Sequence, residues 1–237
     1  MNQIAMFEAV PDVAPKTKVH LSWSDNQDEI LRTIMTIYNE GLPFECDPMY
    51  NVGTFYKNLP EPRWKYDLMP TAPGCERGDA TDLPLDDDSV RSVILDPPFL
   101  VGNSKTGVMR DRYTKIPTMD ALQELYFGII KEAYRVLMPK SILVMKYQIC
   151  VSSGSKYPIH HTALSYALEA GFTFVDETPL IRYTPMSQEH TTRGGQQHTK
   201  AADPRYMTAR KGKLSARERK ERALLTLSAG GRNAQES

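Results

Sequence analysis

The sequence has no excess of charge of either sign and no long apolar run. Lys and Arg together number 29, and so do Asp and Glu, which gives the 237-residue chain a formal net charge of zero. The overall charge therefore does not indicate a polyanionic partner, and charge has to be considered segment by segment. No apolar run reaches the ~18 residues of a membrane span, and the first residues lack a signal-peptide pattern. We expect no membrane partner.

The sequence also lacks the usual patterns of a metal site or of a disulfide framework. The three cysteines are scattered and form no Cys-x-x-Cys pair: Cys46, Cys75 and Cys150. His160 and His161 are adjacent, so they cannot form the i, i+4 pair of a helical metal site. The acidic run 86–88 is typical of a solvated turn. We therefore expect no metal and a protein of a reducing, cytoplasmic compartment.

Apolar periodicity predicts helices alternating with strands over most of the chain. Ser24 as N-cap and Gly41 as C-cap frame a first helix, Thr118 and Pro139 a second, and a third runs from His160 or His161 to Ala170 before Gly171. Strands are expected in the segments 42–47, 64–67, 93–95, 141–147, 172–175 and 206–209. Such alternation predicts an α/β fold with a parallel, doubly wound sheet that binds ligands at the carboxyl ends of its strands.

The segment Val93–Phe99 is where we expect the chemistry. Three β-favouring apolar residues are followed by Asp96, Pro97, Pro98 and Phe99, which is typical of a buried strand that stops at a functional edge. Proline lacks a backbone N–H and fixes its own φ, so the two prolines end the strand ladder. A carboxylate, backbone carbonyls and an aromatic ring then lie within one short span. They could bind an amine on a flat ring.

This tetrapeptide resembles the [DNS]-P-P-[YFW] motif of the S-adenosylmethionine-dependent amino-methyltransferases, which act on exocyclic amines of nucleic-acid bases. The resemblance implies that Asp96 and the carbonyl of Pro97 accept the two hydrogens of the amine, while Phe99 stacks on a base turned out of its helix. It also implies a Rossmann-like class I methyltransferase sheet and S-adenosyl-L-methionine as cofactor. A plain strand-terminating turn is the alternative interpretation of the four residues.

A second stretch resembles the cofactor loop D-P-F-x-G-x-G-T of the same enzymes. The matching or replaced positions are Asp47, Pro48, Asn51, Gly53 and Thr54. Asn51 stands where the family has its first glycine; asparagine tolerates positive φ but brings a side chain. The resemblance implies that this loop holds the methionine part of the cofactor. An Asx turn at a strand end is the alternative.

Two further acids complete the resemblance. Asp67 ends the strand 64–67, where such sheets place the acid that binds ribose hydroxyls; a solvated strand-end aspartate is the other interpretation. Asp79 and Ala80 lie in a segment similar to the family's G-D-[AC]-x-x-L-P, in which the acid accepts from the adenine amine of the cofactor. The four landmarks occur in the family's order, and together they are far more specific than any one of them.

Local basic charge follows the Asp-Pro-Pro-Phe segment. The glycine-punctuated loop 100–117 carries four basic residues: Lys105, Arg110, Arg112 and Lys115. It is either a filler loop or a clamp on nucleic-acid phosphates, and we favour the clamp. The polar segment 183–204 could also contact nucleic acid or be a plain surface loop. The residues divide into a flexible arm (1–20), a methyltransferase domain (21–212), and a basic helix and tail (213–237).

The resemblance covers about residues 42–212 and is closest to small phage and bacterial adenine-specific DNA methyltransferases, as in restriction-modification. It implies a methyltransferase acting on the adenine amine of DNA, as monomer or homodimer. Two alternatives stay open. One is an RNA base amino-methyltransferase, and the other is an inactive nucleic-acid-binding protein that kept the fold. Methylation of protein glutamine is disfavoured because its enzymes usually carry Asn at the position of Asp96.

Overall fold

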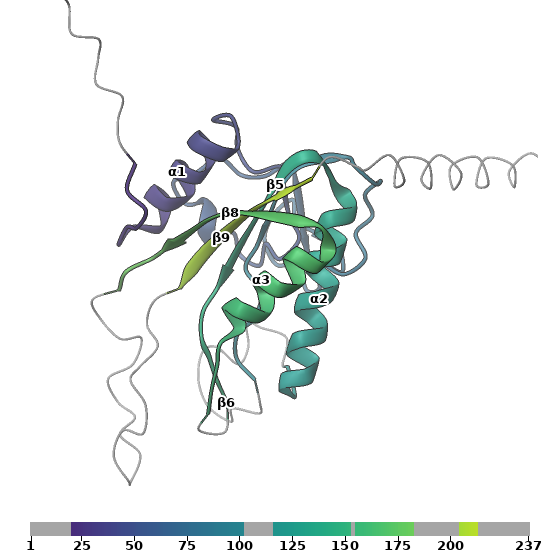
Figure 1. Cartoon of the computed structure of the whole chain (residues 1–237). Helices are drawn as coiled ribbons and strands as arrows, with labels where there is room; N and C mark the ends of the chain where they lie inside the picture. The colour runs from purple at the N-terminus through teal and green to yellow at the C-terminus, as the bar shows by residue number, and fades with distance from the viewer. Residues whose placement is uncertain (1–19, 102–115, 153–154, 183–203, 213–237) are drawn as a thin grey trace, which may run out of the picture.

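The computed structural model describes residues 20–101, 116–152, 155–182 and 204–212 (Figure 1). Within them, one sheet has seven strands: β1 (Cys46–Asp47), β2 (Trp64–Asp67), β3 (Glu76–Arg77), β4 (Val90–Leu95), β5 (Leu137–Tyr147), β8 (Phe172–Pro179) and β9 (Arg205–Lys211). The helical elements are α1 (Gln27–Tyr38), η1 (Thr54–Tyr56), α2 (Met119–Val136) and α3 (Ile159–Ala170). A separate hairpin pairs β6 (Cys150–Ser152) with β7 (Ser155–Tyr157).

The strand order confirms the predicted fold class. The order is β3-β2-β1-β4-β5-β9-β8, with β1 to β5 parallel and β9 antiparallel to both of its neighbours. This is a Rossmann-like arrangement. The expectation of a wholly parallel sheet is wrong at the β8–β9 edge, because β8 and β9 run in opposite directions. The carboxyl ends of β1, β2 and β4 meet at one edge.

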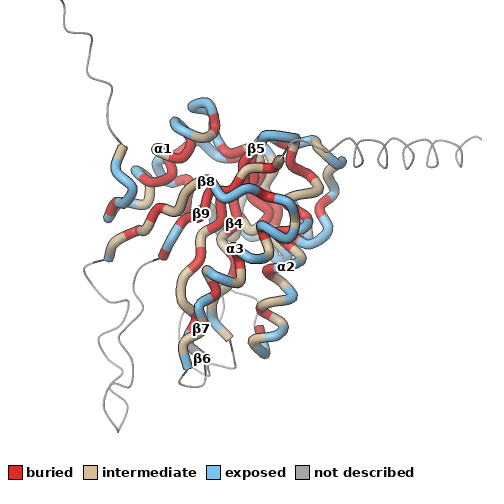
Figure 2. Tube along the Cα trace, viewed as in Figure 1, coloured by how far each residue is buried: buried red, intermediate tan, exposed pale blue. Residues whose placement is uncertain are grey.

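Helices cover both faces of the sheet (Figure 1), and the core divides accordingly. Residues alternate along the central strands, as the two-residue period requires. One face joins α2 and α3 to Val93, Leu95, Leu143 and Met145. The other face joins α1 to Ile94, Ile142 and Val144. Figure 2 shows these central strands as the most continuously buried part of the chain. The sheet that carries the site is therefore rigid.

Helix ends differ from the predictions in two places. Asn26, and not Ser24, is the N-cap of α1, because its side-chain oxygen accepts from the amides of Asp28 and Glu29. Ser24 instead donates its hydroxyl proton to the Glu29 carboxylate. The C-cap is Asn39 and not Gly41. The caps at Thr118 and Gly171 are confirmed, and Gly171 has a φ of 101°.

The second difference lies where α2 meets β5. The helix ends at Val136, and Leu137 already pairs with Val90 of β4, so Leu137 belongs to the sheet and not to the helix face. Pro139 lies inside β5 and does not end the helix. The chain can pass directly from α2 into β5 because Leu137 has an extended backbone, with φ −69° and ψ 135°.

The connections between the strands near the site are mostly loops. Residues 48–89 are all described, and within them only η1 is helical. The sequence predicts no helix between the strands 42–47 and 93–95, and the described structure has no α-helix there. Loops cover this part of the sheet edge, and they carry most of the predicted binding residues. Among the described residues, no helix has the length and apolar character that crossing a membrane would require.

Candidate active site at the carboxyl edge of the sheet

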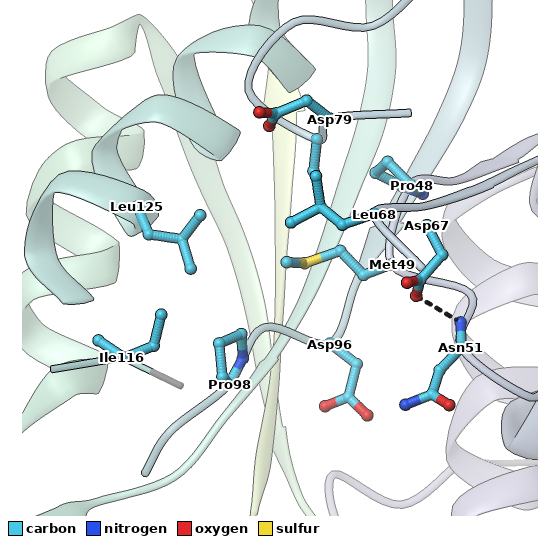
Figure 3. Close-up of a pocket in the computed structure, with 11 residues that line it drawn as sticks. Pro48, Met49, Asn51, Asp67, Leu68, Asp79, Asp96, Pro98, Ile116 and Leu125 are labelled. Carbon is cyan, nitrogen blue, oxygen red and sulfur yellow. Dashed lines mark hydrogen bonds between the residues drawn. The ribbon is translucent and has the colours of Figure 1, made fainter. Parts of the chain in front are cut away.

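A pocket opens at the carboxyl ends of β1, β2 and β4, and it encloses about 740 Å³ of empty space, part of it open to solvent. Its walls contain three of the predicted acids, Asp67, Asp79 and Asp96 (Figure 3). The other lining residues are Pro48, Met49, Asn51, Leu68, Ala80, Pro98, Ile116 and Leu125. A smaller polar pocket adjoins it, lined by Asp47, Met49, Tyr50, Asn51, Thr54, Phe55 and Asp96. The two pockets share Met49, Asn51 and Asp96.

Asp96 stands directly after the last residue of β4, where the ladder stops. Its side chain lines both pockets, and its carboxylate lies between Pro98 and Asn51 in the view of Figure 3. Of this side chain, 24% is exposed. Burial raises the pKa of the Asp96 carboxyl, while the positive charge of Lys146 acts in the opposite direction. The ammonium of Lys146 lies 3.2 Å from Oδ2 of Asp96. The carboxylate is therefore accessible and held by one identified partner.

The remaining residues of the Asp-Pro-Pro-Phe segment take different places. Pro98 is part of the pocket wall, and its carbonyl accepts a hydrogen bond from the Tyr126 hydroxyl at 3.3 Å. Pro97 is buried, and Phe99 is half-buried. Neither residue lines either pocket. The structure thus brings Asp96 and Pro98 to the cavity and leaves the stacking role of Phe99 a prediction.

Asp47 ends β1 below the smaller pocket, and its side chain is almost completely buried. It accepts hydrogen bonds from the Tyr56 hydroxyl at 2.8 Å and from the Met49 amide at 3.0 Å. Burial raises the pKa of Asp47 to about 7, although these two hydrogen bonds lower it and the charges of Asp96 and Asp67 raise it further. Asp47 therefore holds the loop in place from inside.

The loop after β1 uses two residues with positive φ, Asn51 at 54° and Gly53 at 69°. The amide of Asn51 donates to Oδ2 of Asp67 at 2.9 Å, which ties this loop to the end of β2 (Figure 3). A Cβ on Gly53 would lie 2.5 Å from the hydroxyl oxygen of Tyr50, so only glycine fits there. Thr54 begins η1 and lines the smaller pocket. Asparagine thus supplies the positive φ at the first glycine position of the family pattern.

The other two acids lie across the larger pocket from the Asp-Pro-Pro-Phe corner. Asp67 also accepts from the Met69 amide at 2.8 Å, yet each of its oxygens can accept further hydrogen bonds. Oδ1 of Asp79 accepts from both the amide and the hydroxyl of Thr81. Ala80 is buried in the wall beside it. Acids from two neighbouring loops therefore border one cavity.

The predicted nucleic-acid contacts Lys105, Arg110, Arg112 and Lys115 lie outside the described residues, as do 1–19, 183–203 and 213–237. The two ends of the basic loop can be placed, however. Val101 and Ile116 form an isolated parallel bridge, and Ile116 lines the pocket. Both ends of that loop therefore start beside the cavity.

Sequence reasoning missed Lys146 and the apolar wall made by Leu68, Ile116 and Leu125. A signal for Lys146 was present, because a lysine interrupts the apolar run Ile142–Met145 at the carboxyl end of its strand. The apolar wall had no comparable signal, since its three members come from separate loops and from α2.

The donor set suits a ligand with hydroxyl and amine groups on an apolar body. Carboxylates accept at three places around the cavity, while Met49, Leu68, Ile116 and Leu125 offer apolar contact between them. Among the residues that the structure describes, no group of three or more His, Cys, Asp and Glu side chains is arranged to hold a metal ion.

No protein-family model matches the chain. No curated protein matches it either. Several solved structures share its fold. One is a candidate DNA modification methylase of Thermus thermophilus complexed with S-adenosyl-L-methionine, with 19% identity and a TM-score of 0.41 over 60% of this chain and 59% of that one. The match thus spans less than two thirds of that protein's length.

Two further structures match over more of their length. A candidate sarcosine dimethylglycine methyltransferase of Galdieria sulphuraria has 11% identity and a TM-score of 0.46 over 78% of this chain and 85% of its own. A candidate methyltransferase in complex with the Haloferax volcanii Trm112 activator has 14% identity and a TM-score of 0.44 over 81% and 95%. At these identities and TM-scores the likenesses concern the fold alone, and any activity has to be argued from the site itself.

Proposed function

We propose that the protein is an S-adenosylmethionine-dependent methyltransferase that acts on the exocyclic amine of a nucleic-acid base, with adenine in DNA as the first candidate substrate. One observation carries the proposal. Asp96, at the end of β4 and before two prolines, faces the same cavity as Asp67 and Asp79. In this proposal Asp96 binds the reacting amine, and Asp67 and Asp79 bind the nucleoside part of the cofactor.

The cavity residues fit S-adenosyl-L-methionine, which supplies an electrophilic methyl group on a sulfonium. Asp67 would accept from its ribose hydroxyls and Asp79 from its adenine amine, with Ala80, Leu68 and Leu125 against the ring. The loop of Asp47, Pro48, Asn51, Gly53 and Thr54 would hold the methionine part, since it lines the smaller pocket next to Asp96. The larger pocket, which is bordered by the loops between β1 and β4, is partly open to solvent and so gives the ligand access to the site.

The chemistry assigned to the chain is positioning and hydrogen bonding. Asp96 and the carbonyl of Pro97 would accept hydrogen bonds from the two hydrogens of the target amine, which keeps the nitrogen lone pair out of conjugation and available for attack. The new N–C bond would form as the methyl–sulfur bond breaks, and the amine would release one proton to water. Pro98 is fixed by Tyr126, so the backbone of this corner is held still. Such alignment can contribute ~7–11 kcal/mol to lowering the barrier. Phe99 would stack on the base.

A nucleic-acid substrate is supported by the sequence resemblance and by the place of the basic loop. The bridge between Val101 and Ile116 puts both ends of that loop at the cavity, where Lys105, Arg110, Arg112 and Lys115 would reach backbone phosphates. The polar segment before β9 and the basic tail would add further contacts.

The test is methyl transfer from labelled S-adenosyl-L-methionine to DNA, followed by digestion to nucleosides. We expect the label in deoxyadenosine, methylated on its exocyclic amine. Asp96→Ala should lower the rate by about a hundredfold to a thousandfold, because it removes an acceptor used in the transition state. The variant should still bind the cofactor within a few-fold in a calorimetric titration. Asp86→Ala, which changes an exposed acid away from the pocket, is the matched control and should keep full activity.

Three other outcomes would contradict parts of this proposal. Turnover retained by Asp96→Ala would remove Asp96 from its role. Label found only in RNA would change the substrate to an RNA base. No heat at millimolar cofactor would contradict the enzyme assignment and favour a binding protein that kept the fold.

A further inference from the structure

We propose that Lys146 is a positioning residue that holds the Asp96 carboxylate in its ionised, acceptor form and in the orientation that an amine substrate needs. The inference rests on the proposed function, since it adds a residue to the same site. The sequence motifs of that site do not include Lys146, which comes from a different strand. The assignment follows from the packing of β5 against β4.

The strand register places the two side chains together. Leu95 of β4 pairs with Met145 of β5 in parallel register, so the next residues along the two strands are Asp96 and Lys146. Neighbouring residues in register point to the same face of a sheet. Their charged atoms lie 3.2 Å apart, and 24% of the Asp96 side chain and 17% of the Lys146 side chain are exposed. The pair is therefore built by the core strands and not by a surface loop.

A third residue, Phe55, also contacts the ammonium of Lys146. The Lys146 ammonium lies 4.8 Å from the ring centroid of Phe55, a distance typical of a cation–π contact. Phe55 belongs to η1 and is buried, and it lines the smaller pocket together with Asp96. Lys146 thus connects the reacting corner to the loop assigned to the cofactor, which limits the directions in which its charge can point.

The other groups that act on Asp96 cannot replace this charge. Asp47 of β1 is an acid, and Tyr126 of α2 and Tyr206 of β9 are phenols, and the negative charge of Asp96 raises the pKa of each of the three. None of them carries a positive charge. Lys146 is the cation that faces Asp96 among the residues that the structure describes.

The chemical consequence concerns which form of Asp96 is present at neutral pH. Burial raises the pKa of Asp96 and Lys146 opposes that effect, so loss of the lysine charge leaves burial unopposed. A protonated carboxyl has one oxygen occupied by its own hydrogen, and it accepts a hydrogen bond from an amine less well. Without the lysine charge, the rate of methyl transfer would therefore fall first at the acidic end of the pH range.

The experiment compares the pH profiles of wild type, Lys146→Gln and Lys146→Arg, measured on the full chain with labelled S-adenosyl-L-methionine and DNA from about pH 5 to about pH 9. Glutamine keeps a hydrogen-bond donor but removes the charge, while arginine keeps both. We expect the acidic limb of Lys146→Gln to move upward by about one pH unit, which is about tenfold in rate below the limb. Lys146→Arg should restore the wild-type limb. Lys131→Met, on the exposed face of α2, should leave the profile unchanged.

The outcomes separate this inference from the proposed function. A rate that falls equally at every pH in Lys146→Gln, with no recovery by arginine, would make Lys146 a purely structural residue. If wild type transfers no methyl group to any nucleic acid, the proposed function fails, and a carbon-13 NMR titration of the aspartate carboxyls still tests the pair. The signal lost in Asp96→Asn identifies Asp96, and its midpoint should rise by about one unit in Lys146→Gln. An unmoved midpoint would overturn the inference.

Discussion

The two edges of the sheet differ in how fully their charged side chains are paired. At the amino end of β4 and β5, Lys211 is fully buried, and its ammonium bonds to Asp88 at 2.5 Å and to the carbonyls of Tyr134 and Leu137. Arg135 nearby bonds to Glu132 and to the carbonyl of Leu85. Every charge named here has a fixed partner inside the protein.

The carboxyl edge of the sheet has four carboxylates, Asp47, Asp67, Asp79 and Asp96, which come from β1, β2, the loop after β3 and the end of β4. Among the described residues, Lys146 is the one cation that forms an ion pair with any of them. Three of these acids, Asp67, Asp79 and Asp96, line the larger pocket and keep the capacity to accept further hydrogen bonds. Paired charges lock the fold, whereas accepting groups around a cavity are suited to a ligand. The amino end therefore serves stability, and the carboxyl end is the candidate site.

The two ends are also connected along the chain. The segment between β3 and β4 begins with Asp79 and Ala80 at the pocket and continues to Leu83, whose amide donates to Glu132 and whose carbonyl accepts from Arg135. The partnered charges of the amino end thus anchor a loop that borders the cavity.

The largest effect on stability is expected from Lys211→Met. The change removes the buried ammonium that donates to Asp88 and to the carbonyls of Tyr134 and Leu137, which should lower the free energy of unfolding by about 3–5 kcal/mol. Urea denaturation followed by circular dichroism measures the loss. The comparison predicts that the cofactor affinity of the folded protein changes little, because no atom of Lys211 lies at the pocket.

A second change checks the cause of that loss. Asp88→Asn in the Lys211→Met background removes the negative charge that Lys211 neutralised. Asparagine tolerates the positive φ of 53° at this position. We expect the double variant to recover part of the lost stability. A double variant less stable than Lys211→Met would show that the ion pair is not the origin of the effect.

At the carboxyl end, Asp47→Asn should change how stability depends on pH. The pKa of Asp47 is raised to about 7 in the folded protein from an ordinary value of 3.8, so between these values the folded state binds more protons than the unfolded state. The free energy of unfolding therefore falls as the pH rises through this window, by roughly 4 kcal/mol at most. The fall is complete above the folded pKa.

Asparagine at position 47 cannot ionise, so this part of the decrease should disappear. Relative to wild type, Asp47→Asn should become more stable as the pH rises from about 5 to about 8. Denaturation curves at several pH values measure the difference, with Asp86→Asn as an exposed control that should leave the slope unchanged. An unchanged slope in Asp47→Asn would mean that Asp47 is ionised in the folded state at all these pH values.

The sequence predicted helix ends correctly where the capping residue and its partner lie within a few residues of each other. Thr118 and Gly171 act as caps within a few residues, and both are confirmed. Ser24 as an N-cap and Pro139 as a helix end were predicted wrongly, because the backbone there is held by partners distant in the sequence. Ser24 forms a bridge with Leu180, and Leu137 pairs with Val90.

The same distinction holds for the site. Asp67 and Asp96 could be placed at one edge because parallel strands end together, and the structure brings both to one cavity. The bonds from Tyr56 to Asp47 and from Tyr126 to Pro98 could not be predicted, since each joins elements whose separation depends on packing. The pairing of Lys146 with Asp96 requires the register between β4 and β5, which the sequence does not state.

The smallest effects on stability and on cofactor affinity are expected at Asn51. At this position the site depends on the backbone conformation of the loop and not on a charge. Its φ of 54° favours Gly or Asn, so Asn51→Gly should leave stability nearly unchanged, while Asn51→Ala should cost about 1 kcal/mol. Both variants keep the amide that donates to Asp67. Titration of S-adenosyl-L-methionine by calorimetry should give Asn51→Gly an affinity at least equal to that of wild type and Asn51→Ala an affinity about fivefold weaker. A large loss in Asn51→Gly would instead show that the asparagine side chain itself binds the ligand, and the site would then depend on more than its carboxylates and its loop conformation.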